Sequence, residues 1–387
     1  MNRQPLLRSH FKTMVIHHLL VTGESIFLDR HQCLFKALSS HFEQLSFSPR
    51  QSEWYEARLP RTLLKSLLTL RTGSLSKANA VFQKNSTAFI LKSRHTERTI
   101  QRLQPKPDFV LQIFGTYSPV WDAGNIPYAM FLDYTAALAE RNWSSWATFL
   151  SDRTRTAWFE CERSAYSRAE HIFSMSQVVK TSLIEEYGIP ENKVTVVGSS
   201  GDFQVPDVRE KAIGSQQILF NGSDFERKGG DLVLAAFRQV RKALPNSKLV
   251  VIGRKLSIEE PGVENPGHIA DRAEIRRLFL NTDLVVAPAY CDPFPTFLME
   301  AMNYGIPCVV SNRDGMPEIV DHEINGIVLQ HLTSEHLAKH LIDLLTNPAV
   351  LLSMSQAAQM KVRTQLNWNA IAKTIAQTLK SEAYDYV

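Results

Sequence analysis

The stretch that decides the fold is Asp292 to Glu300, D-P-F-P-T-F-L-M-E, followed directly by A-M-N-Y-G-I-P-C-V-V-S. It predicts a turn at Pro293–Thr296, an apolar helix that ends near Gly305, and a strand at Cys308–Ser311. The two carboxylates stand eight positions apart, so Asp292 is expected at the helix mouth and Glu300 on the same side of the helix. The helix mouth suits an anion and the carboxylates suit hydroxyl groups. A ligand with sugar hydroxyls and a diphosphate would satisfy both.

Strands and helices alternate through the second half of the chain. Strands are predicted at Ile218–Asn221, Lys248–Ile252, Leu284–Ala287 and 325–329, and helices at Asp231–Ala243, Ala273–Asn281 and within 334–380. Continuous apolar strands such as L-V-V-I are typical of a parallel sheet that is covered on both faces. Ligands bind such sheets at the carboxyl ends of the strands. The loops after Asn221, Ile252 and Ala287 are therefore candidate binding positions.

The first half shows a similar but weaker alternation. Strands are predicted at Met14–Val21, Phe109–Phe114, Tyr128–Leu132, Ile172–Ser174 and Lys193–Val197, and helices at Phe27–Phe42, Trp158–Ala169 and Val178–Tyr187. Residues 50–105 are expected to be basic and irregular around a helical patch of leucines at 63–68. For that patch, an ordinary amphipathic helix packed on the core is preferred to an interfacial helix.

The loop Gly198–Asp202 and Pro206 mark the candidate domain boundary. We expect an N-terminal domain at 1–204 and a C-terminal domain at 205–365. A last helix within 366–387 is expected to pack back on the N-terminal domain.

The amino-acid composition limits the classes of protein to which the chain can belong. The chain has 387 residues, 44% hydrophobic and 21% charged, as expected for a two-domain globular protein. Its four cysteines have no paired spacing, which predicts neither a zinc site nor a disulfide framework and fits a reducing cytoplasm. No run reaches the roughly 18 apolar residues that span a bilayer, and the first apolar run lacks the cleavage site of a signal peptide.

Charge is unevenly placed. Residues 1–120 hold 17 Lys and Arg against 7 Asp and Glu, a net charge of +10, whereas the remainder carries −6. The basic part predicts an anionic partner, either a membrane surface, a phosphorylated lipid or nucleic acid. A solvated basic surface without a partner is the open alternative. No interleaving of basic and aromatic residues supports nucleic-acid binding.

A glycine-rich cationic loop follows the strand Ile218–Asn221. It reads G-S-D-F-E-R-K-G-G, with Arg227 and Lys228 at the carboxyl end of the strand. Two adjacent cations there can neutralise a diphosphate, and glycines such as Gly222 let the backbone approach a ligand. Neither G-x-x-x-x-G-K-[ST] nor G-x-G-x-x-G is present, so the loop is not a P-loop and a dinucleotide site lacks its fingerprint.

Together the two segments resemble the donor domain of the retaining glycosyltransferases of family 4 (glycosyl transferases group 1), which have the GT-B architecture. The family signature is E-P-F-G, a helix with a second Glu, then E-A-M-x-x-G-x-P-V-V. D-G-M-P-E-I-V at 314–320 and N-G-I-V-L at 325–329 are further matches. The resemblance covers about 215–375 closely, and 127–135 and 158–203 more weakly. It implies an α/β fold of two Rossmann-like, doubly wound parallel-sheet domains that face each other across a cleft.

The resemblance also implies roles for four residues in catalysis. Arg227 and Lys228 would bind the donor diphosphate and stabilise the leaving nucleotide. Glu300 would hold the ribose hydroxyls, and Asp292 would contact the transferred sugar. Further donor-binding residues are expected at Gly222, Arg254, Ile269, Phe294, Pro295 and Thr296, and acceptor-side residues at Gly23 and Asp133.

The sequence departs from the family pattern at three places. Asp292 stands where Glu is usual, and Pro295 replaces a glycine and offers no N–H. The usual histidine before Asp133 is replaced by Leu132. A strand-end capping Asp is an equally weighted interpretation of Asp133. These departures put donor preference in doubt.

The implied reaction moves a hexose from a UDP- or GDP-linked sugar to an acceptor hydroxyl, with retention of configuration and without a metal or other cofactor. The acceptor would be a carbohydrate or a lipid-linked sugar in polysaccharide, glycolipid or glycoconjugate synthesis. The expected location is the cytoplasm, or the inner face of the membrane, with peripheral contact to anionic lipid. A non-catalytic nucleotide-sugar binding protein and a dinucleotide-dependent oxidoreductase or epimerase are the competing interpretations.

Overall fold

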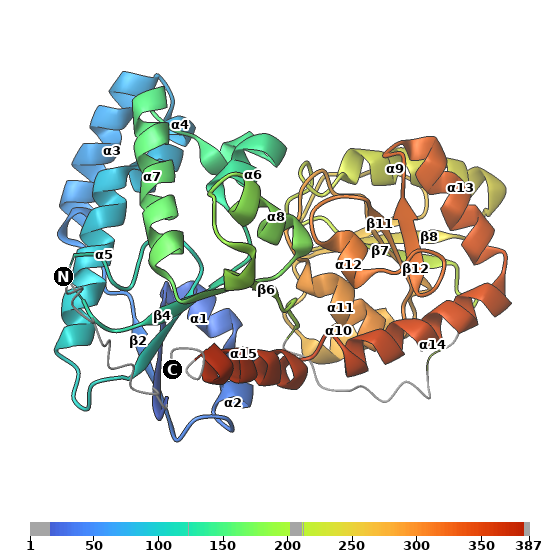
Figure 1. Ribbon diagram of the computed structural model, residues 1–387. Coiled ribbons are helices and arrows are strands. Elements are labelled where there is room, and N and C mark those ends of the chain that lie inside the picture. Colours follow the sequence, from blue (N-terminus) through green and yellow to red (C-terminus); the bar gives the residue numbers. More distant parts are fainter. Residues whose placement is uncertain (1–15, 123, 202–210, 212, 383–387) are drawn as a thin grey trace, which may run out of the picture.

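The computed structural model describes residues 16–122, 124–201, 211 and 213–382. They form two six-stranded sheets in which every pair of neighbouring strands is parallel, each with helices on its faces (Figure 1). The predicted α/β class with two doubly wound sheets is confirmed. In both domains the strands run in one direction, so each sheet has one edge formed by strand carboxyl ends.

The N-terminal sheet has the strand order β2-β1-β3-β4-β5-β6. Its strands, in chain order, are β1 His18–Gly23, β2 Gln44–Pro49, β3 Phe109–Ile113, β4 Tyr128–Leu132, β5 His171–Ser174 and β6 Val194–Val196. The residues of β1, β3, β4 and β5 are all buried. Because both faces of these strands are covered, they are apolar almost without interruption.

The C-terminal sheet has the strand order β12-β11-β10-β7-β8-β9. Its strands are β7 Gln217–Asn221, β8 Lys248–Ile252, β9 Val263–Gly267, β10 Leu284–Ala287, β11 Cys308–Ser311 and β12 Gly326–Leu329. The order reverses at β7, where β10 pairs on one side and β8 on the other. Such a reversal opens a crevice at the carboxyl ends of the strands.

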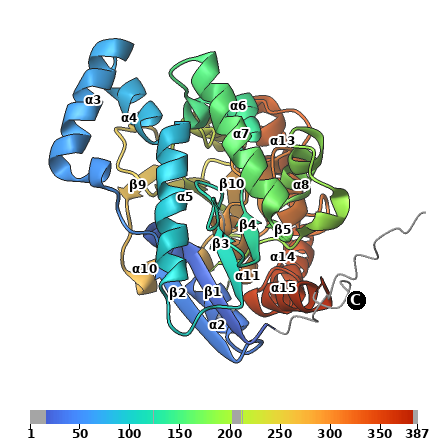
Figure 2. The ribbon, with the colours of Figure 1, turned by 60° about the vertical axis from the view of Figure 1, so that its left-hand side comes forward.

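Helices connect the strands and cover the sheets (Figure 2). In the N-terminal half they are α1 Ser25–Arg30, α2 Gln32–Leu38, α3 Arg58–Thr72, α4 Leu75–Gln83, α5 Ser86–Gln101, α6 Ala136–Asn142, α7 Asp152–Arg168 and α8 Gln177–Glu185, with short 3₁₀ turns η1 Trp54–Glu56, η2 Ser144–Ala147 and η3 Glu191–Lys193. In the C-terminal half they are α9 Gly230–Ala243, α10 Arg272–Leu280, α11 Thr296–Asn303, α12 Met316–Ile319, α13 Ser334–Leu345, α14 Pro348–Thr364 and α15 Trp368–Glu382.

The last helix, α15, crosses back to the N-terminal domain and lies against α2 (Figure 1). Lys380 on α15 donates from Nζ to the carbonyl oxygen of His41 at 2.8 Å. The loop before α15 is tied to the N-terminal half as well, because Ser200 Oγ donates to the carbonyl of Leu366 at 2.9 Å. Of the predicted boundary positions, Asp202 and Pro206 lie outside the described residues.

Two predicted elements are corrected. The single helix expected at Phe27–Phe42 is divided at His31, where α1 ends and α2 begins. The His31 ring packs edge-on against three aromatic rings, including Phe114 and Trp368, which a continuous helix would not allow. Residues 50–105 are also not irregular, because α3, α4 and α5 occupy most of them.

The two strands that the sequence pattern missed are edge strands. β2 pairs only with β1, and Ser48 is its one buried residue, so it lacks the buried apolar run of a central strand. β9 contains Pro266, which a central strand would exclude. β1 itself begins at His18 rather than at Met14, which lies outside the described residues.

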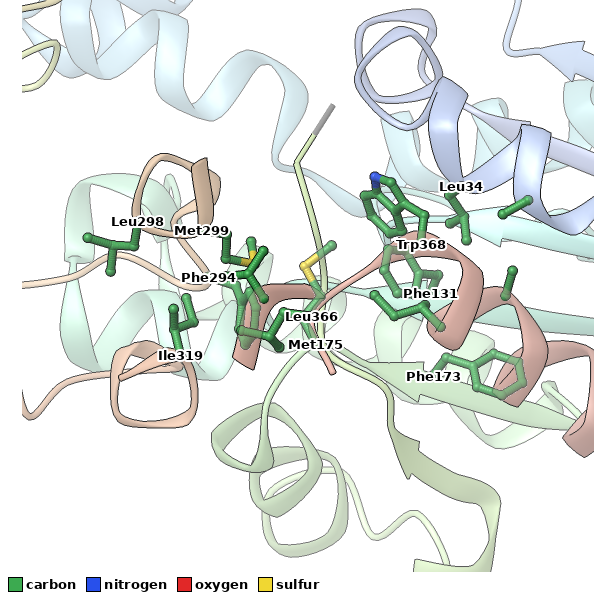
Figure 3. Packing of buried hydrophobic residues seen from close by; sticks show 14 of the residues in the cluster. Leu34, Phe131, Phe173, Met175, Phe294, Leu298, Met299, Ile319, Leu366 and Trp368 are labelled. Atoms are coloured by element: carbon green, nitrogen blue, oxygen red, sulfur yellow. The ribbon is translucent and has the colours of Figure 1, made fainter. Parts of the chain in front are cut away.

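One apolar cluster crosses from one domain to the other (Figure 3). Phe131, Phe173 and Trp368 belong to its N-terminal side, and Leu298 belongs to α11 in the C-terminal domain. Phe294 lies between them, 7% exposed. Burying a large side chain of this kind contributes roughly 1.5–3 kcal/mol. The cluster therefore favours a fixed placement of the α11 mouth against the N-terminal sheet.

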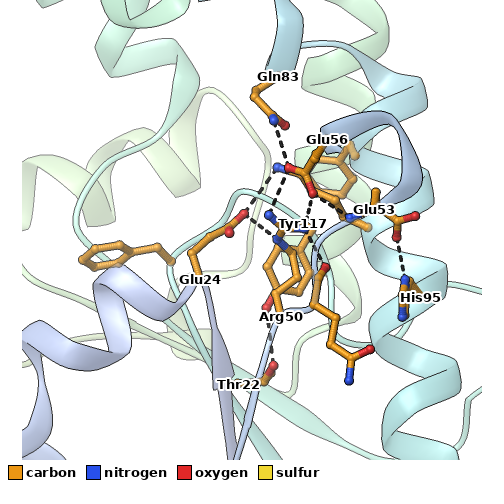
Figure 4. A network of polar contacts seen from close by, with 12 residues as sticks. Thr22, Glu24, Arg50, Glu53, Glu56, Gln83, His95 and Tyr117 are labelled. Carbon is orange, nitrogen blue, oxygen red and sulfur yellow. Dashed lines mark hydrogen bonds and ion pairs between the residues drawn. The ribbon is translucent and has the colours of Figure 1, made fainter. Parts of the chain in front are cut away.

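A buried polar network braces the carboxyl ends of β1 and β2 (Figure 4). Arg50, just after β2, places Nε 2.8 Å from Glu24 Oε1 and Nη1 2.8 Å from Glu56 Oε2. Glu56 also accepts from Gln83 Nε2 at 2.9 Å, which connects η1 to the end of α4. Ion pairs with this much burial are costly to break, because an isolated charge would remain. The network thus holds η1 and the helices α3 to α5 at this edge of the sheet.

Candidate active site

The two sheets direct their carboxyl ends into one cavity of about 1050 Å³. Its C-terminal wall comes from β7, from the loop before α9, and from the start and first turns of α11. Its N-terminal wall comes from α1, the end of α4, the loops after β3 and β4, and α7. Because neither domain closes this space alone, a ligand bound here would touch both.

Lys228, Asp292 and Glu300 line the same cavity. Lys228 Nζ lies 3.2 Å from Asp292 Oδ2, and both side chains are mostly buried. Gly229, which follows Lys228, has a positive φ of 75°, and a Cβ there would collide with the carbonyl of Pro288. Only glycine allows this approach, which brings the cationic loop against the segment that follows β10.

Arg227 lies behind the cavity wall rather than on it. It is 8% exposed and donates from Nη1 to the carbonyl of Cys291 at 2.5 Å. Its Nε pairs with Asp224 at 2.7 Å, and its guanidinium lies 4.9 Å from the ring centre of Trp146 in the N-terminal domain. Asp292 Oδ2 is 3.5 Å from Nη1. Arg227 therefore supports Asp292 and contacts the opposite domain.

The mouth of α11 forms part of the cavity wall. Phe294, Pro295 and Thr296 line it, and Pro295 is the N-cap of the helix. The first N–H groups of a helix have no partner within it and carry the positive end of its dipole. Glu300 is one turn further along and lies 3.3 Å from Arg272 Nη1. The mouth of α11 and the Glu300 carboxylate thus line the same cavity from one helix.

Of the other predicted site residues, some line the cavity and some do not. Asp133 lines the cavity at the end of β4, whereas Gly222, Arg254, Ile269 and Gly23 do not belong to the wall formed by the described residues. Gly222 donates its N–H to Ile252 at 2.8 Å, and a Cβ there would crowd Val251. In this arrangement Gly222 serves the packing of β7 against β8.

Burial raises the pKa of Asp133 to about 6, although hydrogen bonds from its own and the next backbone N–H lower it. A carboxyl group with this pKa changes charge close to neutral pH. The backbone hydrogen bonds are those of a strand-end cap, so Asp133 combines a capping position with a place on the cavity wall.

A polar network that crosses the cleft was not predicted. Tyr134 donates from its hydroxyl to Asp314 Oδ1 at 2.6 Å, and Asn142 Nδ2 donates to the same oxygen at 2.9 Å. The other oxygen of Asp314 accepts from the backbone N–H of Asp292 at 2.8 Å. Asp314 therefore joins two N-terminal side chains to the residue that opens the α11 turn. The only signal in the sequence was the D-G-M-P-E-I-V segment, which begins at Asp314.

The N-terminal wall of the cavity also holds a partly buried lysine that was not predicted. Lys84 lines the wall beside Trp158 and Glu162. Burial lowers the pKa of Lys84, and attraction to Glu162 partly offsets this. Glu162 is already held by donors, from Trp158 Nε1 at 3.0 Å and Tyr187 at 2.5 Å. Among the described residues Lys84 has no ion pair within 4.0 Å, and an isolated lysine gives no sequence signal.

No group of three or more His, Cys, Asp or Glu side chains is placed to hold a metal ion in the part of the chain that the structure describes. None of its helices is both long enough and apolar enough to cross a membrane.

Comparison with known sequences identifies the C-terminal half. Residues 204–361 match the family model "Glycosyl transferases group 1". The chain is 24% identical over 230 residues to D-inositol 3-phosphate glycosyltransferase of Segniliparus rotundus, covering 53% of this chain and 51% of that protein. It is 23% identical over 267 residues to glycogen synthase of Mycobacterium tuberculosis, covering 65% and 63%. The matches thus span about half to two thirds of these relatives.

Solved structures match over nearly the whole chain. Sucrose-phosphate synthase from Thermosynechococcus elongatus has a TM-score of 0.65 at 15% identity, covering 94% of this chain and 98% of that one. Anabaena HepE in complex with UDP has a TM-score of 0.64 at 16% identity, covering 94% and 100%. At such identity the likeness establishes the fold. The sequence of residues 204–361 is thus similar to the glycosyl transferases group 1 family, and the described chain shares the two-domain GT-B fold of these solved structures.

Proposed function

We propose that the protein is a retaining, metal-independent glycosyltransferase of family 4. It transfers a hexose from a UDP- or GDP-linked sugar to an acceptor hydroxyl. The observation that carries the proposal is the single cavity between the domains, in which Lys228, Asp292, Glu300 and the mouth of α11 converge. The match to the glycosyl transferases group 1 model and the likeness to a protein crystallised with UDP support it.

The donor binds on the C-terminal wall. Its diphosphate lies at the mouth of α11 and takes Lys228 as a counter-ion. Asp292 Oδ2 lies 3.2 Å from Lys228 Nζ, which keeps the ammonium group at the cavity wall. When the diphosphate pairs with Lys228, Asp292 becomes free to accept hydrogen bonds from the sugar hydroxyls. Glu300, further along α11, receives the ribose hydroxyls.

In the reaction, the bond between the anomeric carbon and the donor phosphate breaks, and its electron pair leaves with the phosphate. The acceptor oxygen bonds to the anomeric carbon on the same face, and its proton passes to the departing phosphate. Negative charge grows on that phosphate in the transition state. Lys228 and the positive end of α11 are fixed close to it, and such preorganised groups stabilise the transition state with little reorganisation.

The acceptor binds at the N-terminal end of the cavity. Asp133 and Lys84 are its polar groups. The acceptor is a carbohydrate or a lipid-linked sugar, and the reaction takes place on the cytoplasmic side of the membrane. A lipid-linked acceptor would require contact with the membrane surface.

A panel of nucleotide sugars tests this proposal. Thermal unfolding of the full chain should shift upward with the true donor, and that donor should then be hydrolysed slowly in the absence of an acceptor. The shift should be much smaller for Lys228→Ala and unchanged for Lys248→Ala, a matched exposed lysine that pairs with Glu264. Binding without hydrolysis or transfer would instead favour a non-catalytic nucleotide-sugar binding protein.

A further inference from the structure

The outer face of the N-terminal domain carries an apolar stripe that the described part of the protein leaves uncovered. No residue of α3 is buried. Four of its leucines, spaced so that they lie on one side of the helix, are strongly exposed: Leu59 77%, Leu63 66%, Leu67 63% and Leu70 82%. We refer to these four residues as the leucine stripe. A surface helix of a globular protein normally turns such a stripe towards the core.

The opposite side of α3 is the one that contacts the protein. Leu68 packs against a small cluster formed by Tyr55, Phe82 and Ala88, and Lys65 Nζ lies 5.2 Å from the ring centre of Phe82. The preferred expectation of an amphipathic helix packed on the core therefore holds for Leu68 but is wrong for Leu63 and Leu67. The exposure of the leucine stripe follows from the way α3 packs on α4, not from fraying of the helix.

The sequence around the leucine stripe is exclusively cationic. Residues 57–96 contain eight Lys and Arg and no Asp or Glu. On α3 itself the cations are Arg58, Arg61, Lys65 and Arg71. Basic residues beside a large apolar helix face are typical of helices that lie in a membrane interface.

A row of arginines continues this surface along α5. Arg94, Arg98 and Arg102 follow one another at intervals of four residues and line a hollow of about 360 Å³ together with Trp54. Trp54 is 66% exposed and begins η1, which leads directly into α3. The hollow is therefore continuous with the start of the leucine stripe.

The charges in this hollow are largely uncompensated. Arg94 pairs with Asp122 at 2.9 Å. Within the described ranges, neither Arg98 nor Arg102 has an ion pair or a side-chain hydrogen bond. Glu53, an acidic residue that lines the hollow, is instead 2.8 Å from His95 Nδ1 (Figure 4). Two free guanidinium groups beside an exposed tryptophan suit a phosphate at a lipid–water boundary.

We propose that the leucine stripe, Trp54 and the arginines Arg98 and Arg102 form a docking site for an anionic membrane surface. The leucines enter the boundary between head groups and acyl chains, and the arginines pair with lipid phosphates. The helices α3 and α5 lie on the side of the N-terminal domain that faces away from the C-terminal domain (Figure 1). The site is thus separate from the catalytic cavity, and its test needs no transfer activity.

Charge favours a membrane over a second copy of the chain as the occupant. A two-fold pairing of α3 would set the cations of one copy against those of the other with no acid in between, because an isologous contact presents the same patch twice. Unscreened like charges at short distance oppose association. Anionic lipids supply the missing negative charge.

Flotation of the full chain with lipid vesicles tests this proposal. The vesicles are phosphatidylcholine alone, or phosphatidylcholine and phosphatidylglycerol in equal parts, at low and high salt. The variants are Leu63→Glu with Leu67→Glu, and Arg98→Ser with Arg102→Ser. Matched controls are Leu352→Glu, 51% exposed on α14, and Arg363→Ser on the same helix. Donor-induced thermal shifts confirm that each variant is folded.

We expect the wild type and both controls to float with the anionic vesicles only, and to be released by salt, which screens the attraction. The leucine variant should stay at the bottom of the gradient. Each lost arginine should weaken partitioning about fivefold. Failure of the wild type to float, equal flotation with neutral vesicles, or unchanged flotation of the leucine variant would overturn the proposal. So would a concentration-dependent dimer that the leucine variant abolishes.

Discussion

Tyr134→Phe is expected to weaken the coupling between the two domains, because it removes the hydroxyl that donates to Asp314 across the cleft, lies 3.5 Å from Cys291 Sγ and accepts from Asn142. The Tyr134 hydroxyl donates to Asp314 at 2.6 Å, and Asp314 is only 9% exposed. A hydrogen bond to a charged group contributes roughly 1.5–3 kcal/mol. In the variant, Asp314 still accepts hydrogen bonds from Asn142 Nδ2 and from the Asp292 N–H. Both of its carboxylate oxygens therefore keep a donor. We therefore expect a loss of about 2 kcal/mol in the free energy of unfolding.

Denaturant unfolding of the full chain, followed by tryptophan fluorescence, measures this loss. The matched control is Tyr290→Phe, whose hydroxyl reaches Asp231 at 3.3 Å in an exposed position within one domain. Its expected cost is below about 1 kcal/mol.

A double-mutant cycle isolates the bond itself. The partner substitution is Asp314→Asn, since Asp314 has a φ of 48° and asparagine tolerates this left-handed backbone. The cycle should give a coupling energy of about 1.5–3 kcal/mol. A coupling energy near zero, or a Tyr134→Phe effect no larger than that of Tyr290→Phe, would refute the reasoning.

Three further outcomes are expected. Lys228→Ala should lower kcat/KM about 10²–10³-fold, because roughly 2–4 kcal/mol of transition-state stabilisation is lost. Its unfolding midpoint should be like that of Lys248→Ala. Wild-type turnover would contradict the diphosphate role. Lys84→Met should raise the acceptor KM in steady-state kinetics while the thermal shift with donor stays the same, and a change in donor affinity alone would argue against acceptor binding. The pKa of Asp133 is raised to about 6, so its ionised form opposes folding and stability is lost as pH rises towards that value. Asp133→Asn should therefore raise the unfolding midpoint above pH 6 more than below it. An equal rise at both pH values would show that Asp133 is not desolvated.

The regular part of the chain could be predicted because its signals are local. The strands Tyr128–Leu132, Lys248–Ile252, Leu284–Ala287 and Cys308–Ser311 were predicted to the residue. Each is a buried run between turn residues, so burial and boundaries are both written in the composition. The edge strands β2 and β9 were missed, since a strand with one partner and one exposed face needs no apolar run.

The helices of residues 50–105 show a different limit. The leucines at 63, 64, 67 and 68 predict a helix, but not which side of it meets the protein. The structure turns the leucine stripe outward, because the contacts of α3 with α4 are made by the opposite face. Periodicity alone cannot separate a stripe that packs on the core from one that awaits a partner.

The sequence by itself determined the chemistry of the donor wall. A cationic loop after one strand and a carboxylate-flanked helix mouth after another must meet, because parallel strands end at one edge of a sheet. Only the tertiary structure decided the rest. It placed Arg227 behind Asp292 and against Trp146, brought Tyr134 and Asn142 to Asp314, and set Lys84 on the N-terminal wall of the cavity. These residues belong to elements far apart in the chain, and their proximity depends on how the two domains pack, which no local pattern encodes.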